Sequence, residues 1–173
     1  IGIRTMFNIL GPLTNPAGVK RQLIGVSDGR VSAALADVLA LLGAERVLFA
    51  TAHDGLDEIG VSGPTDIVEF DRDRSSTRAY TIDPAMLGLE EASRETILGG
   101  SIEENVEIVR SVLRGEGGPR RTVTLINAGA AIYTAGAADS IEQGIAKAAD
   151  AIDSGRAISV LHHVVDLTQS FEA

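Results

Sequence analysis

Asp57 and Glu58 are a pair of adjacent carboxylates that an apolar run delivers to the end of a predicted strand, where they could do chemistry. The pair follows the apolar run 47–50 within RVLFATAHDGLDEI, after a turn through His53 to Gly55. In an open α/β sheet, ligands bind beyond the carboxyl ends of the strands. Adjacent acidic residues are also common on solvated surfaces, but the preceding strand and the glycine favour a ligand role. Because Mg²⁺ takes oxygen ligands, usually one or two carboxylates with phosphates and waters, the pair predicts a site for one or two ions.

A second set of candidates lies near the start of the chain. Arg4 carries a planar guanidinium, which can grip a carboxylate or a phosphate through two parallel hydrogen bonds. Pro12, Asn15 and Pro16 force the backbone out of a helix and would shape a cleft. The spacing alone favours a short helix with an ordinary surface cation, followed by a capped loop, and leaves the ligand-binding interpretation open.

The histidines are weaker candidates. His53 could serve as a general acid or base, but a histidine at a strand end more commonly makes a structural hydrogen bond. His162 and His163 are neighbours on a predicted helix, whereas a chelating pair needs i,i+4 spacing. The chain has no P-loop, no G-x-G-x-x-G loop and no Ser-His-Asp set. We therefore assign no residue as a catalytic acid or base.

The elements that must position the acidic pair form a βαβ unit. QLIGV at 22–26 predicts a short strand, and apolar residues at helical spacing over 31–42 predict a helix that ends at Gly43. The strand at 47–50 follows. A right-handed crossover would make the two strands parallel.

The rest of the chain predicts a hairpin and then helices. Strands at 66–70 and 78–82 would pair at the margin of the sheet, and the charged run 71–74 between them is typical of a solvated turn. Ser101 and Glu104 form a capping-box pattern. Helical segments are predicted from that pattern to Leu113, over 122–136, over 140–155 and from Arg156 to about Thr168.

Composition limits the class of protein. The 173 residues carry a formal charge of −9, which disfavours nucleic acid as a partner because no basic stripe can displace its counterions. There is no cysteine, which excludes disulfides and thiolate metal sites. No apolar run approaches the roughly 20 residues of a membrane span. We expect a soluble cytoplasmic protein, and the start at Ile1 inside a dense motif suggests a piece of a longer chain.

Several motifs together carry a resemblance over nearly the whole chain. Five segments resemble the carboxyl-terminal part of the anthranilate phosphoribosyltransferases: RTMFNILGPLTNPAG, QLIGV, HDGLDEIG, GGSIEENV and NAGAAIYTAG. The resemblance implies an α/β fold with a mainly parallel sheet flanked by helices, of the nucleoside phosphorylase and phosphoribosyltransferase type. It further implies that 1–18 form a hinge helix and substrate loop shared with a helical domain, and that 19–173 form an incomplete α/β catalytic domain. The full-length protein would be a homodimer.

The resemblance also implies an activity and roles for the candidate residues. The family transfers a phosphoribosyl group from phosphoribosyl pyrophosphate to anthranilate and releases pyrophosphate, in tryptophan biosynthesis. Arg4 would grip the anthranilate carboxylate, Pro12, Asn15 and Pro16 would line the substrate approach, and Asp57 and Glu58 would bind two Mg²⁺ ions.

The glycine-rich phosphate loop and a Lys-His segment lie upstream of Ile1 in the family, so this chain alone would be inactive. Alternatives are a pyrimidine nucleoside phosphorylase of the same fold and a non-catalytic paralogue that binds nucleic acid. A third is a folded scaffold or interaction domain without catalysis.

Overall fold

The sheet has four strands in the order β1-β2-β3-β4. The computed structural model describes residues 11 and 13–171. The strands are β1 (Arg21–Gly25), β2 (Arg46–Ala52), β3 (Thr65–Asp71) and β4 (Ser76–Ile82). Helix α2 (Ser32–Leu41) connects β1 to β2, which pair in parallel with Leu23 opposite Leu48. The predicted βαβ unit is therefore confirmed.

The α/β fold class is confirmed, but the described sheet is mixed rather than mainly parallel. β3 runs antiparallel to both β2 and β4. A parallel pair needs a crossover connection, usually a helix, whereas antiparallel neighbours can be joined directly. Only the β1-to-β2 connection contains a helix; the loop 53–64 and the turn after Asp71 contain none. The predicted hairpin is thus present and accounts for the antiparallel margin.

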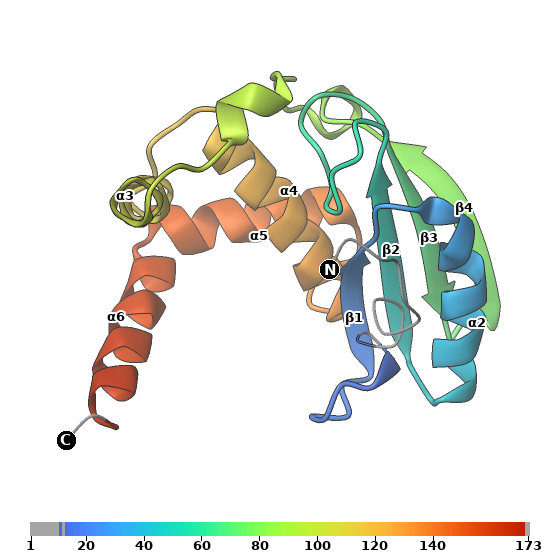
Figure 1. The fold of residues 1–173 in the computed structure, drawn as a ribbon. Helices are drawn as coiled ribbons and strands as arrows, with labels where there is room; N and C mark the ends of the chain where they lie inside the picture. Colours follow the sequence, from blue (N-terminus) through green and yellow to red (C-terminus); the bar gives the residue numbers. More distant parts are fainter. Residues whose placement is uncertain (1–10, 12, 172–173) are drawn as a thin grey trace.

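Helices cover both faces of the sheet (Figure 1). β2 is buried on both sides, as expected of a central strand. Val47 and Phe49 pack with α2 on one face, and Leu48 and Ala50 pack with the carboxyl-terminal helices on the other.

The carboxyl-terminal half is helical, as predicted. The helices are α3 (Ile102–Leu113), α4 (Pro119–Thr134), α5 (Ile141–Asp153) and α6 (Arg156–Gln169). Three short 3-10 segments, η1 (Gly29–Val31), η2 (Ala85–Leu87) and η3 (Arg94–Ile97), lie in the connections. The Ser101 and Glu104 capping box is present, with bonds of 3.2 and 2.7 Å. No helix of the described ranges is long and apolar enough to cross a membrane.

Helix α4 packs on α5 through a close backbone contact. Gly129 and Gly144 bring the two helix backbones together so closely that a Cβ on either residue would overlap its neighbour. The close approach requires glycine at both positions. The contact thereby restrains α4, which carries Asn127, relative to α5.

The charged turn between β3 and β4 has a buried end that charge patterning did not predict. Arg72, Asp73 and Arg74 are exposed, as expected of a solvated turn. Asp71, in contrast, is only 4% exposed and pairs with Arg46 at 2.8 Å. Asp71 is the last residue of β3 and faces the neighbouring strand, so its pairing depends on the sheet register rather than on the local run of charges.

Candidate functional site

The carboxylate loop, residues 53–62, follows β2 at the carboxyl end of the parallel pair. Asp57 and Glu58 are exposed there. Neither side chain forms a hydrogen bond or an ion pair with any residue of 13–171. Two adjacent carboxylates thus stand at a strand end without a side-chain hydrogen bond or ion pair to any other described residue.

A third carboxylate in the loop, Asp54, has a structural role. Its two oxygens accept hydrogen bonds from the Leu56 N–H at 3.0 Å and from the Ser62 hydroxyl at 2.5 Å. The Ser62 hydrogen bond is the main reason that the pKa of Asp54 lies below its ordinary value. Gly55 takes a positive φ of 84°, which glycine adopts without strain. Asp54 and Gly55 therefore shape the turn that leads to the acidic pair.

The loop is then anchored in the core immediately after the pair. Ile59 and Val61 are each 1% exposed and belong to the core cluster between the sheet and the carboxyl-terminal helices. The side-chain amide of Asn127, on α4, makes two hydrogen bonds to the backbone of Ile59. The Ile59 N–H donates to Asn127 Oδ1 at 3.0 Å, and Asn127 Nδ2 donates to the Ile59 carbonyl at 2.9 Å.

Strand β1 supports the loop from the other side. A Cβ built on Gly25, the last residue of β1, would overlap the backbone carbonyl of Asp57. Glycine is therefore required at this position for the loop to lie against the strand end. Neither Gly25 nor Asn127 was among the sequence candidates. Both residues lie within motifs that carry the family resemblance, Asn127 at the start of NAGAAIYTAG and Gly25 in QLIGV, but nothing local to these motifs indicates a contact with the carboxylate loop.

The histidines have no catalytic arrangement in the described structure. His53 contacts Asp66 at 3.0 Å, the structural role that its position predicted. The Thr81 hydroxyl, with a further contribution from His53, lowers the pKa of Asp66. His162 and His163 lie exposed on α6.

The substrate candidates near the chain start fall into two groups. Arg4 and Pro12 lie outside the described residues. Asn15 and Pro16 lie in an exposed turn in which the Ala17 N–H donates to Asn15 Oδ1 at 2.9 Å. This turn precedes the amino end of β1, whereas the carboxylate loop follows the carboxyl end of β2 (Figure 1). The structure therefore does not bring Asn15 and Pro16 next to Asp57 and Glu58.

The donor set at the acidic pair fits Mg²⁺ better than a metal with a closed protein shell. In the described ranges no three His, Cys, Asp or Glu residues are grouped to hold an ion. Mg²⁺ binds through one or two carboxylates and completes its shell with waters and phosphate oxygens. Two exposed, unpaired carboxylates provide such an open set.

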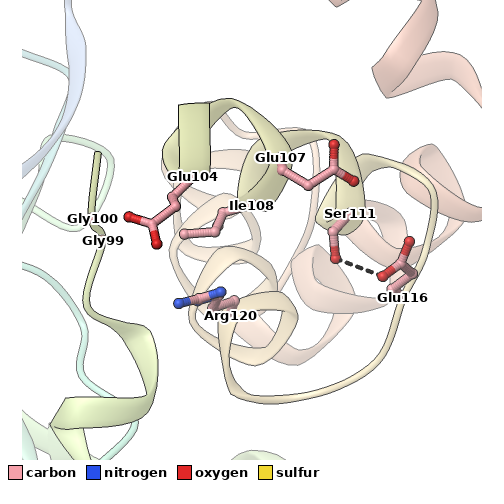
Figure 2. A pocket seen from close by; sticks show the side chains of 8 residues that line it. All are labelled: Gly99, Gly100, Glu104, Glu107, Ile108, Ser111, Glu116 and Arg120. Carbon is pink, nitrogen blue, oxygen red and sulfur yellow. Dashed lines mark hydrogen bonds between the residues drawn. The ribbon is translucent and has the colours of Figure 1, made fainter. Parts of the chain in front are cut away.

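A second acidic feature, a hollow of about 400 Å³ between α3 and the loop before α4, has a structural explanation (Figure 2). Glu104 caps α3, and Glu107 bonds to Arg114 at 2.6 Å. Glu116 accepts from Ser111 at 2.8 Å, as the dashed line in Figure 2 marks. Each glutamate of this hollow thus has a partner, whereas Asp57 and Glu58 have none among residues 13–171.

Comparison with known families places the chain in a class of enzymes. Residues 1–158 match the family described as "Glycosyl transferase family, a/b domain", and the chain belongs to this family. Among curated relatives, the anthranilate phosphoribosyltransferase of Methanobrevibacter smithii is 45% identical over 170 residues, which is 98% of this chain and 50% of the relative. That of Syntrophotalea carbinolica is 46% identical over 169 residues, or 98% and 47%. The chain spans about half the length of the curated relatives it matches.

Solved structures show the same relation. Anthranilate phosphoribosyltransferase from Thermus thermophilus has a TM-score of 0.84 and 37% identity, with 95% of this chain and 48% of that one covered. The Saccharomyces cerevisiae enzyme in complex with PRPP and Mg has a TM-score of 0.86 and 30% identity, with coverages of 98% and 48%. The expected resemblance and fold type are confirmed.

Proposed function

We propose that the full-length protein containing this chain is a Mg²⁺-dependent anthranilate phosphoribosyltransferase of tryptophan biosynthesis. The observation that carries the proposal is the pair Asp57 and Glu58, held at a strand end by a structured loop and left without partners among the described residues. The relatives named above supply the reaction class. In this proposal the acidic pair holds Mg²⁺ on the pyrophosphate of phosphoribosyl pyrophosphate. The family resemblance implies two such ions.

The reaction forms a bond between ribose C1 and the anthranilate nitrogen and breaks the bond from C1 to the pyrophosphate oxygen. Positive character develops on the ribose, negative charge develops on the leaving pyrophosphate, and the amine loses its proton after attack. Bound Mg²⁺ would neutralise charge on the leaving group. An aromatic amine needs little deprotonation to attack, so stabilising the leaving group contributes more than a general base would.

The residues of this chain have a positioning task in that reaction. Asp54 and Gly55 form the turn before the pair, Asn127 fixes the backbone after it, and Gly25 allows the loop to lie against β1. Arg4 would orient the anthranilate carboxylate through its planar guanidinium. Pro12, Asn15 and Pro16 would line the substrate approach, as the family resemblance implies.

The organisation of the whole protein is part of the proposal. Residues 1–18 would join a helical domain contributed by the rest of the protein, and 19–173 would supply part of the catalytic domain. The family resemblance further proposes a cytoplasmic homodimer that binds no nucleic acid and no membrane. The other phosphate contacts would come from the portion of the relatives that this chain does not span.

Substrate profiling of the full-length protein tests the function. With Mg²⁺ and phosphoribosyl pyrophosphate, we expect anthranilate to be consumed, which its fluorescence reports, and pyrophosphate to be released in equal amount. Phosphorolysis of thymidine instead would identify a pyrimidine nucleoside phosphorylase and refute the proposal. The purified 173-residue chain should show no transfer, and detectable turnover by it would refute the idea that the site is incomplete.

A further inference from the structure

The side chain of Asn127, on α4, holds the loop backbone immediately after the acidic pair. The Glu58–Ile59 peptide contributes the N–H that donates to Asn127 Oδ1, and the Ile59 carbonyl accepts from Asn127 Nδ2. A planar amide that makes two hydrogen bonds to one residue restrains both the position and the orientation of that residue. Glu58, the residue immediately before Ile59, is thereby fixed at its peptide bond.

The orientation of the Asn127 amide is itself determined. Nδ2 donates a second hydrogen bond, at 3.0 Å, to the carbonyl of Val123 one turn earlier in α4. Because an amide nitrogen has two donors and no acceptor, a flipped amide would place its oxygen against the carbonyls of Ile59 and Val123. All the hydrogen bonds that the structure assigns to this side chain therefore favour one orientation.

Helix α4 provides a rigid base for the two hydrogen bonds between Asn127 and Ile59, which we call the clamp. Two residues beyond Asn127, Gly129 fixes α4 against α5 through the backbone contact with Gly144. On the opposite side of the loop, the end of β1 at Gly25 lies against the carbonyl of Asp57. The acidic pair is thus confined between a strand end and a helix, and its two side chains remain exposed.

We propose that Asn127 is a positioning residue for the metal-binding pair, and that its hydrogen bonds to Ile59 set the affinity of Asp57 and Glu58 for the divalent cation. The inference rests on the proposed function, because it assumes that the pair binds a metal. Partners that orient the ligands of a metal contribute about 10–100-fold to metal affinity. Asn127 acts through the backbone, so we expect an effect of about tenfold, the lower end of that range.

The test compares Asn127→Ala with a matched control in the full-length protein. Asn105 makes the same kind of two-sided contact with the backbone of Gly100, at 3.0 and 3.1 Å, on α3. Mn²⁺ serves as the probe, and its free concentration is measured by electron paramagnetic resonance during titration. We expect Asn127→Ala to raise the Mn²⁺ dissociation constant about tenfold, and Asn105→Ala to leave it unchanged.

Steady-state kinetics separates positioning from loss of folded protein. Asn127→Ala should raise the Mg²⁺ concentration for half-maximal rate while saturating Mg²⁺ restores most of the rate. A merely structural role would lower the maximal rate without shifting that concentration. If Asn127→Ala fails to fold, Asn127→Leu is measured instead, since it has a similar volume, adds no charge near the acidic pair and removes the hydrogen bonds to Ile59 and Val123.

The outcomes are distinguishable. Mn²⁺ binding by the Asn127 variant that matches the unsubstituted protein, or an equal change in Asn105→Ala, would overturn the positioning role. Suppose that the unsubstituted protein binds Mn²⁺ at the acidic pair and that Asn127→Ala weakens this binding, but that the unsubstituted protein transfers no phosphoribosyl group. This result would support the positioning role of Asn127 and refute the proposed function. Mn²⁺ binding that is unchanged by Asp57→Asn and Glu58→Gln would refute both the positioning role of Asn127 and the proposed metal site.

Discussion

Two acidic regions of this domain are built in opposite ways. Asp57 and Glu58 are exposed at the end of β2 and have no partner among the described residues. Glu69, in the middle of β3, is fully buried and accepts hydrogen bonds from Arg78 at 2.8 Å, Tyr80 at 2.9 Å and Tyr133 at 2.8 Å.

The difference separates carboxylates that hold the fold from those that remain available to a ligand. Burying a charge costs free energy unless it is paired and hydrogen-bonded, and Glu69 meets that condition through donors from the sheet and from α4. Burial, with the nearby Glu69, raises the pKa of both tyrosines, so their hydroxyls stay protonated and can donate. The comparison predicts that changes at the two regions affect different measurements.

Neutralising the exposed pair should have the largest effect, on activity alone. Asp57→Asn combined with Glu58→Gln removes the charge that attracts Mg²⁺, so we expect kcat/KM for phosphoribosyl pyrophosphate to fall about 1,000-fold, or roughly 4 kcal/mol in the barrier. The free energy of unfolding should change by less than about 0.5 kcal/mol, because neither side chain supports the fold. Steady-state kinetics and urea unfolding of the full-length protein measure the two quantities. Near-unchanged activity would remove the metal assignment.

Truncating the buried acid should have the reverse pattern. Glu69→Ala leaves two tyrosine hydroxyls without their acceptor and opens a cavity beside Arg78, which we expect to cost about 2–4 kcal/mol of unfolding free energy. Urea unfolding measures this loss. The Mg²⁺ concentration for half-maximal rate should stay the same in the protein that remains folded. A shift in that concentration would contradict the separation of the two regions.

Crowding the contact between β1 and the loop should affect both measurements moderately. Gly25→Ala places a methyl group where the Asp57 carbonyl lies, so the loop must move. We expect a loss of about 1–3 kcal/mol in stability from this overpacking and a higher Mg²⁺ concentration for half-maximal rate. Gly117→Ala is a control that meets no atom, and it should do neither.

Removing a hydrogen bond of the loop turn should have the smallest effect, and one that depends on pH. Ser62→Ala removes the main contact that lowers the pKa of Asp54. Because the folded-state pKa is lowered, the stabilisation is fully present above the unfolded value of about 3.9 and disappears as pH falls through the folded value. The unfolding free energies of the two proteins, measured with urea, should therefore differ slightly near pH 7, by under about 1 kcal/mol at this exposed site. The gap should close below about pH 4, and a gap that widens in acid would contradict this account.

Local pattern was sufficient to predict most elements. Period and turn signals predicted the βαβ unit, the hairpin and the four late helices, and the capping box at Ser101 is a local hydrogen-bond motif that needs no tertiary contact. The sheet is mixed because the connection between β2 and β3 contains no helix, so the two strands are antiparallel. The prediction of a mainly parallel sheet did not take this connection into account.

The sequence by itself determined that an acidic pair would follow a buried strand, because hydrophobic run length and glycine placement are local properties. Only the tertiary structure decided which acids are available. Asp71 and Glu69 are chemically like the exposed pair, but their partners Arg46 and Tyr133 come from β2 and from α4. Asn127 lies 68 positions from Ile59 and reaches it only because α4 packs on the sheet. Long-range packing, which residue spacing does not encode, thus distinguishes a ligand-ready carboxylate from a structural one.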